Sequence, residues 1–81
     1  MAKKELNGEE LDRHRIMKIV GDRIAMARDV AGLTQYDLSK LAGVTRVQIC
    51  NIELGRSDLP VSRLVRVARA CNIKPGRLLP S

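Results

Sequence analysis

Two helix-start signals lie eleven residues apart in the middle of this 81-residue chain. Thr34 precedes Asp37 by three positions, and Thr45 precedes Gln48 by three. At this spacing the threonine hydroxyl accepts a backbone N–H of the first turn, and the later side chain accepts the threonine N–H. Gly43 lies between the two signals and is suited to end the first helix. The pattern predicts two short helices joined by a tight turn.

Helices joined through one glycine must cross steeply, so apolar residues of limited size must fill the crossing. The chain supplies such a wedge: Leu38, Ala42, Val44, Ile49 and Ile52. Leu41 is expected on the apolar face of the first helix, beside Leu38 and Ala42. This arrangement is a helix-turn-helix over about residues 34–55, in which the second helix can enter the major groove of DNA.

A longer helix is predicted over about residues 9–31, with Asn7 and Glu10 at capping-box spacing and Gly32 as its end. Its inward face carries apolar residues at helical spacing: Ile16, Val20, Ile24 and Ala27. Gly21 inside this helix either marks a bend or lets another helix approach closely.

A fourth helix is expected to begin near Pro60 and a fifth to form one last turn from Pro75 through Leu79. The fourth helix has a buried stripe, Leu64, Val67, Ala68 and Cys71, and its arginines, Arg63, Arg66 and Arg69, face either solvent or phosphates. No segment alternates with period two for long enough to form a strand. We therefore expect an all-α fold of five helices, with a flexible segment over residues 1–8 and a single domain over residues 9–81.

Composition excludes several classes of protein. The chain is 44% hydrophobic and 30% charged, which is typical of a soluble globular domain. No apolar run approaches the roughly 20 residues of a membrane span, and the first residues do not form a signal peptide. Cys50 and Cys71 have neither CxxC spacing nor partner histidines, so we expect no metal or other cofactor and reduced thiols in a cytoplasm.

Basic residues are concentrated in the later part of the chain. The formal net charge is +6; residues 1–31 carry seven basic and six acidic side chains, and residues 32–81 carry eight and three. This asymmetry favours a polyanionic partner.

The free face of the second motif helix combines residue types that can read bases. Its members are Arg46, Val47, Gln48, Cys50 and Asn51. Arginine can donate two hydrogen bonds to guanine, glutamine and asparagine can pair with adenine, and valine can contact a thymine methyl. The alternative interpretation is that these residues form only the solvated side of a short helix.

Taken together, the motif resembles the phage-repressor-like (XRE or Cro type) helix-turn-helix family. The resemblance rests on Gly32-Leu33-Thr34-Gln35, Leu38, Leu41, Gly43-Val44-Thr45, Ile49, Ile52-Glu53-Leu54-Gly55 and the later Leu64, Ala68 and Ile73. It spans about residues 20–79 and implies a five-helix lambda-repressor-like DNA-binding domain. Ser39 departs from the usual alanine but is also small, and Pro60 is shifted by one position.

The resemblance implies a role for particular residues. Those of the free face, Arg46, Val47, Gln48, Cys50 and Asn51, would contact bases, and Gln35, Thr45, Arg56 and Ser57 would contact phosphates. Arg28 and Glu53 match a pair that forms an internal ion pair in relatives, so their role would be structural. Val47 and Cys50 are less polar than many base-reading residues of the family, and oxidation of Cys50 would block the groove.

The chain offers no nucleophile, base and orienting group together, so we expect no enzymatic activity. We expect a homodimeric repressor that reads an inverted repeat in double-stranded DNA, in the cytoplasm of a bacterial or phage-infected cell and associated with its nucleoid. With no separate dimerisation domain in view, the dimer contact would come from Leu78, Leu79 and the last helix, or else from the long first helix. The alternative is a module for a protein partner, such as an antitoxin or a phage antirepressor, on the same fold.

Overall fold

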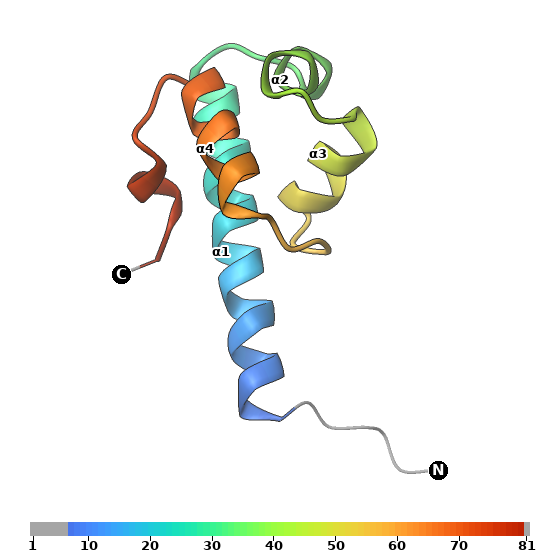
Figure 1. Ribbon diagram of the computed structural model, residues 1–81, viewed down its shortest axis with the longest axis vertical. Helices are drawn as coiled ribbons and strands as arrows, with labels where there is room; N and C mark the ends of the chain where they lie inside the picture. The colour runs from blue at the N-terminus through green and yellow to red at the C-terminus, as the bar shows by residue number, and fades with distance from the viewer. Residues whose placement is uncertain (1–6, 81) are drawn as a thin grey trace.

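The computed structural model of the chain describes residues 7–80 (Figure 1). These residues form four α-helices and one 3₁₀ turn: α1 (Gly8–Val30), α2 (Gln35–Ala42), α3 (Arg46–Glu53), α4 (Val61–Ala70) and η1 (Pro75–Leu78). Helix α1 forms the long axis, with α2 and α3 to one side of it in this view and η1 to the other. The predicted all-α class is confirmed over the described part of the chain.

The predicted fifth helix is wrong, because only the four-residue turn η1 forms there. Leu79 leaves the turn in an extended conformation, with φ −94° and ψ 138°. Pro80 explains this, because the residue before a proline is pushed out of the helical region. Leu78 points into the core and is 1% exposed, so it is not available for the dimer contact predicted for it.

The helix starts follow the predicted caps. The Asn7 side chain accepts from the Glu10 N–H at 2.8 Å, so α1 begins at Gly8, inside the segment expected to be flexible. Residues 1–6 of that segment lie outside the described residues. Thr34 and Thr45 accept from the third residue of α2 and α3, each at 3.0 Å, and both capping boxes are complete.

The buried core combines the predicted wedge and the predicted stripe of α4 with residues of α1 and η1. Its members are Val20, Ile24, Leu38, Ala42, Ile49, Ile52, Leu64, Val67, Ala68, Cys71 and Leu78. Val44, from the wedge, is partly buried against it. The turn between α2 and α3 is made by Gly43, whose φ of 68° is left-handed and favours glycine.

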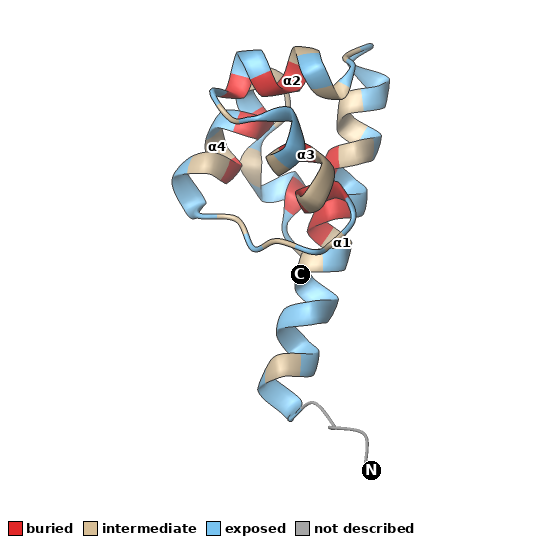
Figure 2. Cartoon of the chain, turned by 90° about the vertical axis from the view of Figure 1, so that its right-hand side faces the viewer, coloured by how far each residue is buried: buried red, intermediate tan, exposed pale blue. Residues whose placement is uncertain are grey.

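Two residues expected in the core are exposed. Leu41 is 62% exposed because α2 turns Leu38, Ser39 and Ala42 inward, and Leu41 lies about 110° around the helix from the middle of that arc. Ile16 is 39% exposed because it lies in the first half of α1, which projects beyond the rest of the domain (Figure 2).

Gly21 allows a close approach between helices. A Cβ at this position would lie 2.3 Å from the carbonyl oxygen of Ile52 and 2.9 Å from that of Glu53. The end of α3 therefore rests directly on the backbone of α1, which decides between the two roles predicted for this glycine.

Two positions that depart from the family pattern, residues 39 and 60, fit the fold through local contacts. Ser39 is buried, and its hydroxyl donates to the Tyr36 carbonyl at 2.6 Å, so no polar group is left unpaired by its burial. Pro60 stands immediately before α4 as its N-cap residue. None of the helices in the described range is long and apolar enough to cross a membrane.

Candidate nucleic-acid interface

One side of helix α3 packs into the core, and the opposite side faces solvent. Ile49 and Ile52 are 0% and 2% exposed and pack into the core with Leu38 and Ala42 of α2. The predicted wedge therefore sets how α3 sits against α2. Figure 2 shows the resulting gradient, in which the start of α3 is exposed and its end is buried.

An ion pair holds the buried end of α3. Arg28 donates from Nε to Glu53 Oε2 at 2.6 Å and from Nη2 to Glu53 Oε1 at 3.0 Å. A third bond, from Arg28 Nη1 to the Leu33 carbonyl at 2.9 Å, ties in the loop before α2. The hydrogen bond with Glu53 raises the pKa of Arg28, so the guanidinium stays charged. These are the two residues to which the family resemblance assigns a structural role.

Gln35 joins the same network. Its Nε2 donates to Glu53 Oε1 at 3.1 Å, from the first residue of α2. The sequence predicts a phosphate contact for Gln35 and gives no sign of this bond, because the two residues lie 18 positions apart. Gln35 is half-buried, and the bond to Glu53 fixes the direction of its amide group at the edge of the network.

The free face of α3 carries the residues predicted to contact bases. Arg46 is exposed, and Val47 is 69% exposed. Cys50 and Asn51 are half-buried on the same helix. Gln48 is also half-buried, and its Oε1 accepts from the Thr45 N–H at 2.8 Å, which leaves its amino group as the part able to reach a ligand. The capping role predicted for Gln48 thus restricts the base contact that is also predicted for it.

A polar hollow separates the starts of α2 and α3. It has a volume of about 430 Å³ and is lined by Arg28, Thr34, Gln35, Tyr36 and Arg46. Tyr36 is 54% exposed, and the Lys40 ammonium lies 4.9 Å from the centre of its ring. No motif in the sequence marks Tyr36 or Lys40, although Tyr36 is the chain's one aromatic residue.

Arg56 and Ser57 lie in the loop after α3. Gly55 makes the turn into this loop with a φ of 72°, and the Arg56 N–H donates to the Asn51 carbonyl at 2.9 Å. Arg56 is exposed and Ser57 half-buried. Thr45, the other predicted phosphate contact, is exposed at the opposite end of α3. The predicted phosphate contacts therefore flank both ends of the free face.

Both cysteines are free thiols. Cys50 is half-buried on α3, whereas Cys71 is in the core, and burial raises the pKa of its thiol. Across residues 7–80, no three His, Cys, Asp or Glu side chains come together in a way that could hold a metal ion.

Comparison with solved structures finds the same fold in bacterial regulators. The restriction-modification controller protein C.AhdI from Aeromonas hydrophila has 27% identity and a TM-score of 0.75, covering 78% of this chain and 96% of its own. The hypothetical transcription factor NHTF from Neisseria has 20% identity and a TM-score of 0.77, covering 99% and 87%. The clp gene regulator ClgR from Corynebacterium glutamicum has 19% identity and a TM-score of 0.75, covering 76% and 66%.

A search of curated proteins found no match. The profile of the HTH_3 family, described as helix-turn-helix, matches residues 24–78, which include α2, the Gly43 turn and α3. The match also contains Arg28 and Glu53, the Thr34 and Thr45 caps, and the core stripe of α4. The chain belongs to the HTH_3 family of XRE-type helix-turn-helix proteins.

Proposed function

We propose that this protein is a transcriptional regulator that binds double-stranded DNA in a sequence-specific way. In this proposal it acts in the cytoplasm as a homodimeric repressor on an inverted repeat. The observation that carries the proposal is the asymmetry of α3: its inner face is locked by Ile49, Ile52 and Glu53, and its outer face presents polar side chains to solvent. A helix held in this way can be inserted into the major groove without losing its orientation.

In this proposal, the residues on the outer face of α3 contact the bases. Arg46 at the first position of the helix is suited to guanine, and Asn51, five residues later, is suited to adenine. Val47 between them offers an apolar contact to a thymine methyl. Gln48 contributes through its amino group, because its carbonyl oxygen caps the helix.

Phosphate contacts position the helix on the duplex. Gln35 at the start of α2, Thr45 at the start of α3, and Arg56 with Ser57 after α3 fill this role on both sides of the reading face. The hollow between α2 and α3 adds the Tyr36 hydroxyl as a further donor, and the Lys40 ammonium, 4.9 Å from the centre of the Tyr36 ring, adds a positive charge beside it. Because phosphate neutralisation releases counterions, binding weakens steeply as salt rises.

The proposed function is tested by selecting binders from random duplex DNA at about 150 mM salt, where non-specific binding is weak. Recovery of a short inverted repeat, with half-site centres about 34 Å apart, supports a dimeric sequence-specific regulator. Recovery of no sequence above background by the folded protein contradicts it.

Substitutions separate base reading from phosphate binding. Arg46→Ala or Asn51→Ala costs about 1–3 kcal/mol at the selected site and relaxes one base position, while random DNA is bound as before. Gln35→Ala or Arg56→Ala weakens binding to both kinds of DNA. Equal losses on selected and random DNA for Arg46→Ala would remove the base-reading role, and unchanged binding to random DNA for Arg56→Ala would remove the phosphate role.

A second candidate is a module that binds another protein, such as a toxin or a repressor. The exposed Met26 and Val30 on α1 favour it, because an apolar patch is what a protein partner would cover. A null result in the DNA selection, together with capture of a partner that Met26→Lys abolishes, would support this candidate over the first.

A further inference from the structure

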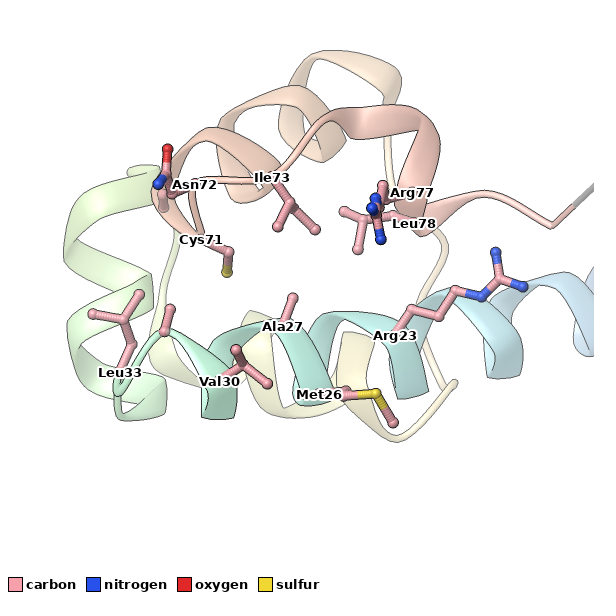
Figure 3. Close-up of a pocket in the computed structure, with 12 residues that line it drawn as sticks. Arg23, Met26, Ala27, Val30, Leu33, Cys71, Asn72, Ile73, Arg77 and Leu78 are labelled. Carbon is pink, nitrogen blue, oxygen red and sulfur yellow. The ribbon is translucent and has the colours of Figure 1, made fainter.

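A groove runs between the second half of α1 and the segment that follows α4 (Figure 3). Its volume is about 680 Å³, which is within the roughly 300–1,000 Å³ typical of small-molecule sites. One wall is a face of α1 that extends from Arg23 through Ala27 to Val30, at helical spacing. None of the lining residues belongs to α2 or α3, so the groove is separate from the proposed DNA interface.

The second wall forms because the chain reverses direction after α4. Asn72 has a φ of 58°, a left-handed conformation that asparagine adopts more readily than most residues and that ends the helix. The segment beyond it returns along α1, and in Figure 3 Cys71 and Ile73 on this side point toward Ala27 on the other. Ala27 and Ala70, which both line the groove, have small side chains, so space remains between the two walls.

The walls of the groove are mainly apolar. Cys71 and Leu78 belong to the buried core, and Ala27 and Ile73 are packed against it. Burial raises the pKa of the Cys71 thiol, so the thiol is neutral at neutral pH. Among the described residues, no Asp or Glu lines the groove. A molecule in the groove would therefore contact apolar surface and no negative charge.

Two arginines give one end of the groove a positive charge. Arg23 and Arg77 lie at this end, and Leu33 lies at the other (Figure 3). The guanidinium of Arg23 is held in place, because its Nη1 donates to the Leu79 carbonyl at 2.5 Å. This bond uses one of the five N–H donors of a guanidinium. Neither arginine forms an ion pair with any of residues 7–80. The charge at this end is thus complementary to an anion.

We propose that the groove binds a small amphipathic carboxylate, with its carboxylate at Arg23 and Arg77 and its aliphatic chain along the apolar walls. Arginine pairs with a carboxylate through two parallel hydrogen bonds. Helix α1 rises about 10 Å from Arg23 to Val30, so the wall beside the arginines accommodates a chain of medium length, such as that of octanoate. The inference goes beyond the proposed function, because this site needs no DNA.

The groove suits this class of ligand better than simpler ones. An inorganic anion would pair with the arginines but leave the apolar walls in contact with water. A neutral apolar molecule would cover the walls but give the arginines no partner. A ligand with an anionic head and an apolar chain makes both kinds of contact at once.

The site is tested by titrating the isotope-labelled full chain with octanoate and following the amide NMR shifts. Acetate supplies the charge without the chain, and octanol supplies the chain without the charge. We expect octanoate to shift the amides of Ala27 and Ile73, with a dissociation constant at least about fivefold below that of octanol, as for an exposed charge pair. Equal affinities for octanoate and octanol, or shifts confined to residues outside the groove, overturn the proposal.

Arg77→Gln and the matched control Arg69→Gln separate a specific charge from general basicity. Both arginines are exposed, but Arg69 lies on α4 and does not line the groove. Circular dichroism checks that both variants fold. We expect Arg77→Gln to weaken octanoate binding about fivefold and Arg69→Gln to leave it unchanged. Equal losses for the two variants would show a general attraction to a basic protein and overturn the proposal.

A series from acetate through butanoate and hexanoate to octanoate tests the apolar walls. A fully buried methylene group is worth about fourfold in affinity, and we expect about twofold for each added methylene because the groove is open to solvent. An affinity that does not change along the series overturns the proposal. Octanoate binding that weakens as the protein concentration rises would show that a second copy of the chain fills the groove, and would also overturn it.

Discussion

Helices α2 and α3 have the same length and the same capping box, yet they bury their polar residues in different ways. The buried Ser39 of α2 is satisfied within its own helix, by the Tyr36 carbonyl. The buried Glu53 of α3 is satisfied by Arg28 and Gln35, which come from two other helices. The buried polar group of α2 is therefore satisfied within its own helix, whereas that of α3 depends on contacts with α1 and α2.

The largest expected effect comes from removing the long-range contact of α3. Glu53→Ala leaves Arg28 without its partner in a site where the Glu53 side chain is only 7% exposed. We expect a loss of about 3 kcal/mol in the free energy of unfolding, at the lower end of the range for broken buried pairs because Arg28 keeps some contact with water. Urea denaturation measures it.

Ser39→Ala is the matched control in α2, and we expect it to cost about 1 kcal/mol or less, because one local hydrogen bond is lost. If the two substitutions cost the same, the contrast between the locally satisfied Ser39 and the long-range contacts of Glu53 is wrong.

The next effect tests the backbone contact between α1 and α3. Gly21→Ala places a methyl group against two carbonyl oxygens of α3, which the backbone can relieve only by moving α3. We expect a loss of about 2 kcal/mol of stability, despite the higher helix propensity of alanine. Gly8→Ala, where a Cβ meets nothing within 4 Å, is the control in the same helix. A stability gain for Gly21→Ala, measured by thermal unfolding, would contradict the close approach.

Cap substitutions give a smaller effect that separates the two helices by function. Thr34→Ala and Thr45→Ala each remove one capping hydrogen bond, and each costs about 1 kcal/mol of stability. In the proposed complex Thr45→Ala also removes a proposed phosphate contact, so it lowers affinity for the selected site more than Thr34→Ala does. Equal affinities for the two variants in a titration at one salt concentration would argue against a special role for the α3 start.

The smallest effect is a pH dependence of α2. Hydrogen bonds from the Thr34 backbone and side chain lower the pKa of Asp37 below its ordinary value of about 3.9. A lowered folded pKa stabilises the fold above the unfolded value, and this stabilisation is lost as the pH falls through the folded value. Asp37→Asn should therefore be less stable than wild type at neutral pH and converge with it in strong acid. A difference that stays constant over that range would contradict the assignment.

Much of this fold could be predicted from local signals. Thr34, Thr45 and Gly43 determine where α2 and α3 begin and where the turn lies, because a cap involves only residues a few positions apart. The apolar spacing of Leu64, Val67 and Ala68 likewise identifies the buried side of α4. These features depend on neighbours along the chain, so the chain alone reveals them.

Other features could not be predicted, for particular physical reasons. Leu41 looks like a core residue by its spacing, but the side of a two-turn helix that is buried depends on its neighbours in space. Tyr36 was missed because the hollow that it lines is formed by residues of separate helices. Ile16 was misplaced because spacing does not show where the rest of the domain stops covering a long helix.

The sequence by itself determined where α2 and α3 begin, the family, and which residues are proposed to read DNA. Only the tertiary structure decided what Gly21 is for, that Gln35 joins Arg28 on Glu53, and that Met26 and Val30 face outward. The physical reason is distance along the chain: caps and stripes are set within a few residues, whereas these contacts join segments far apart in the sequence or depend on what covers a surface.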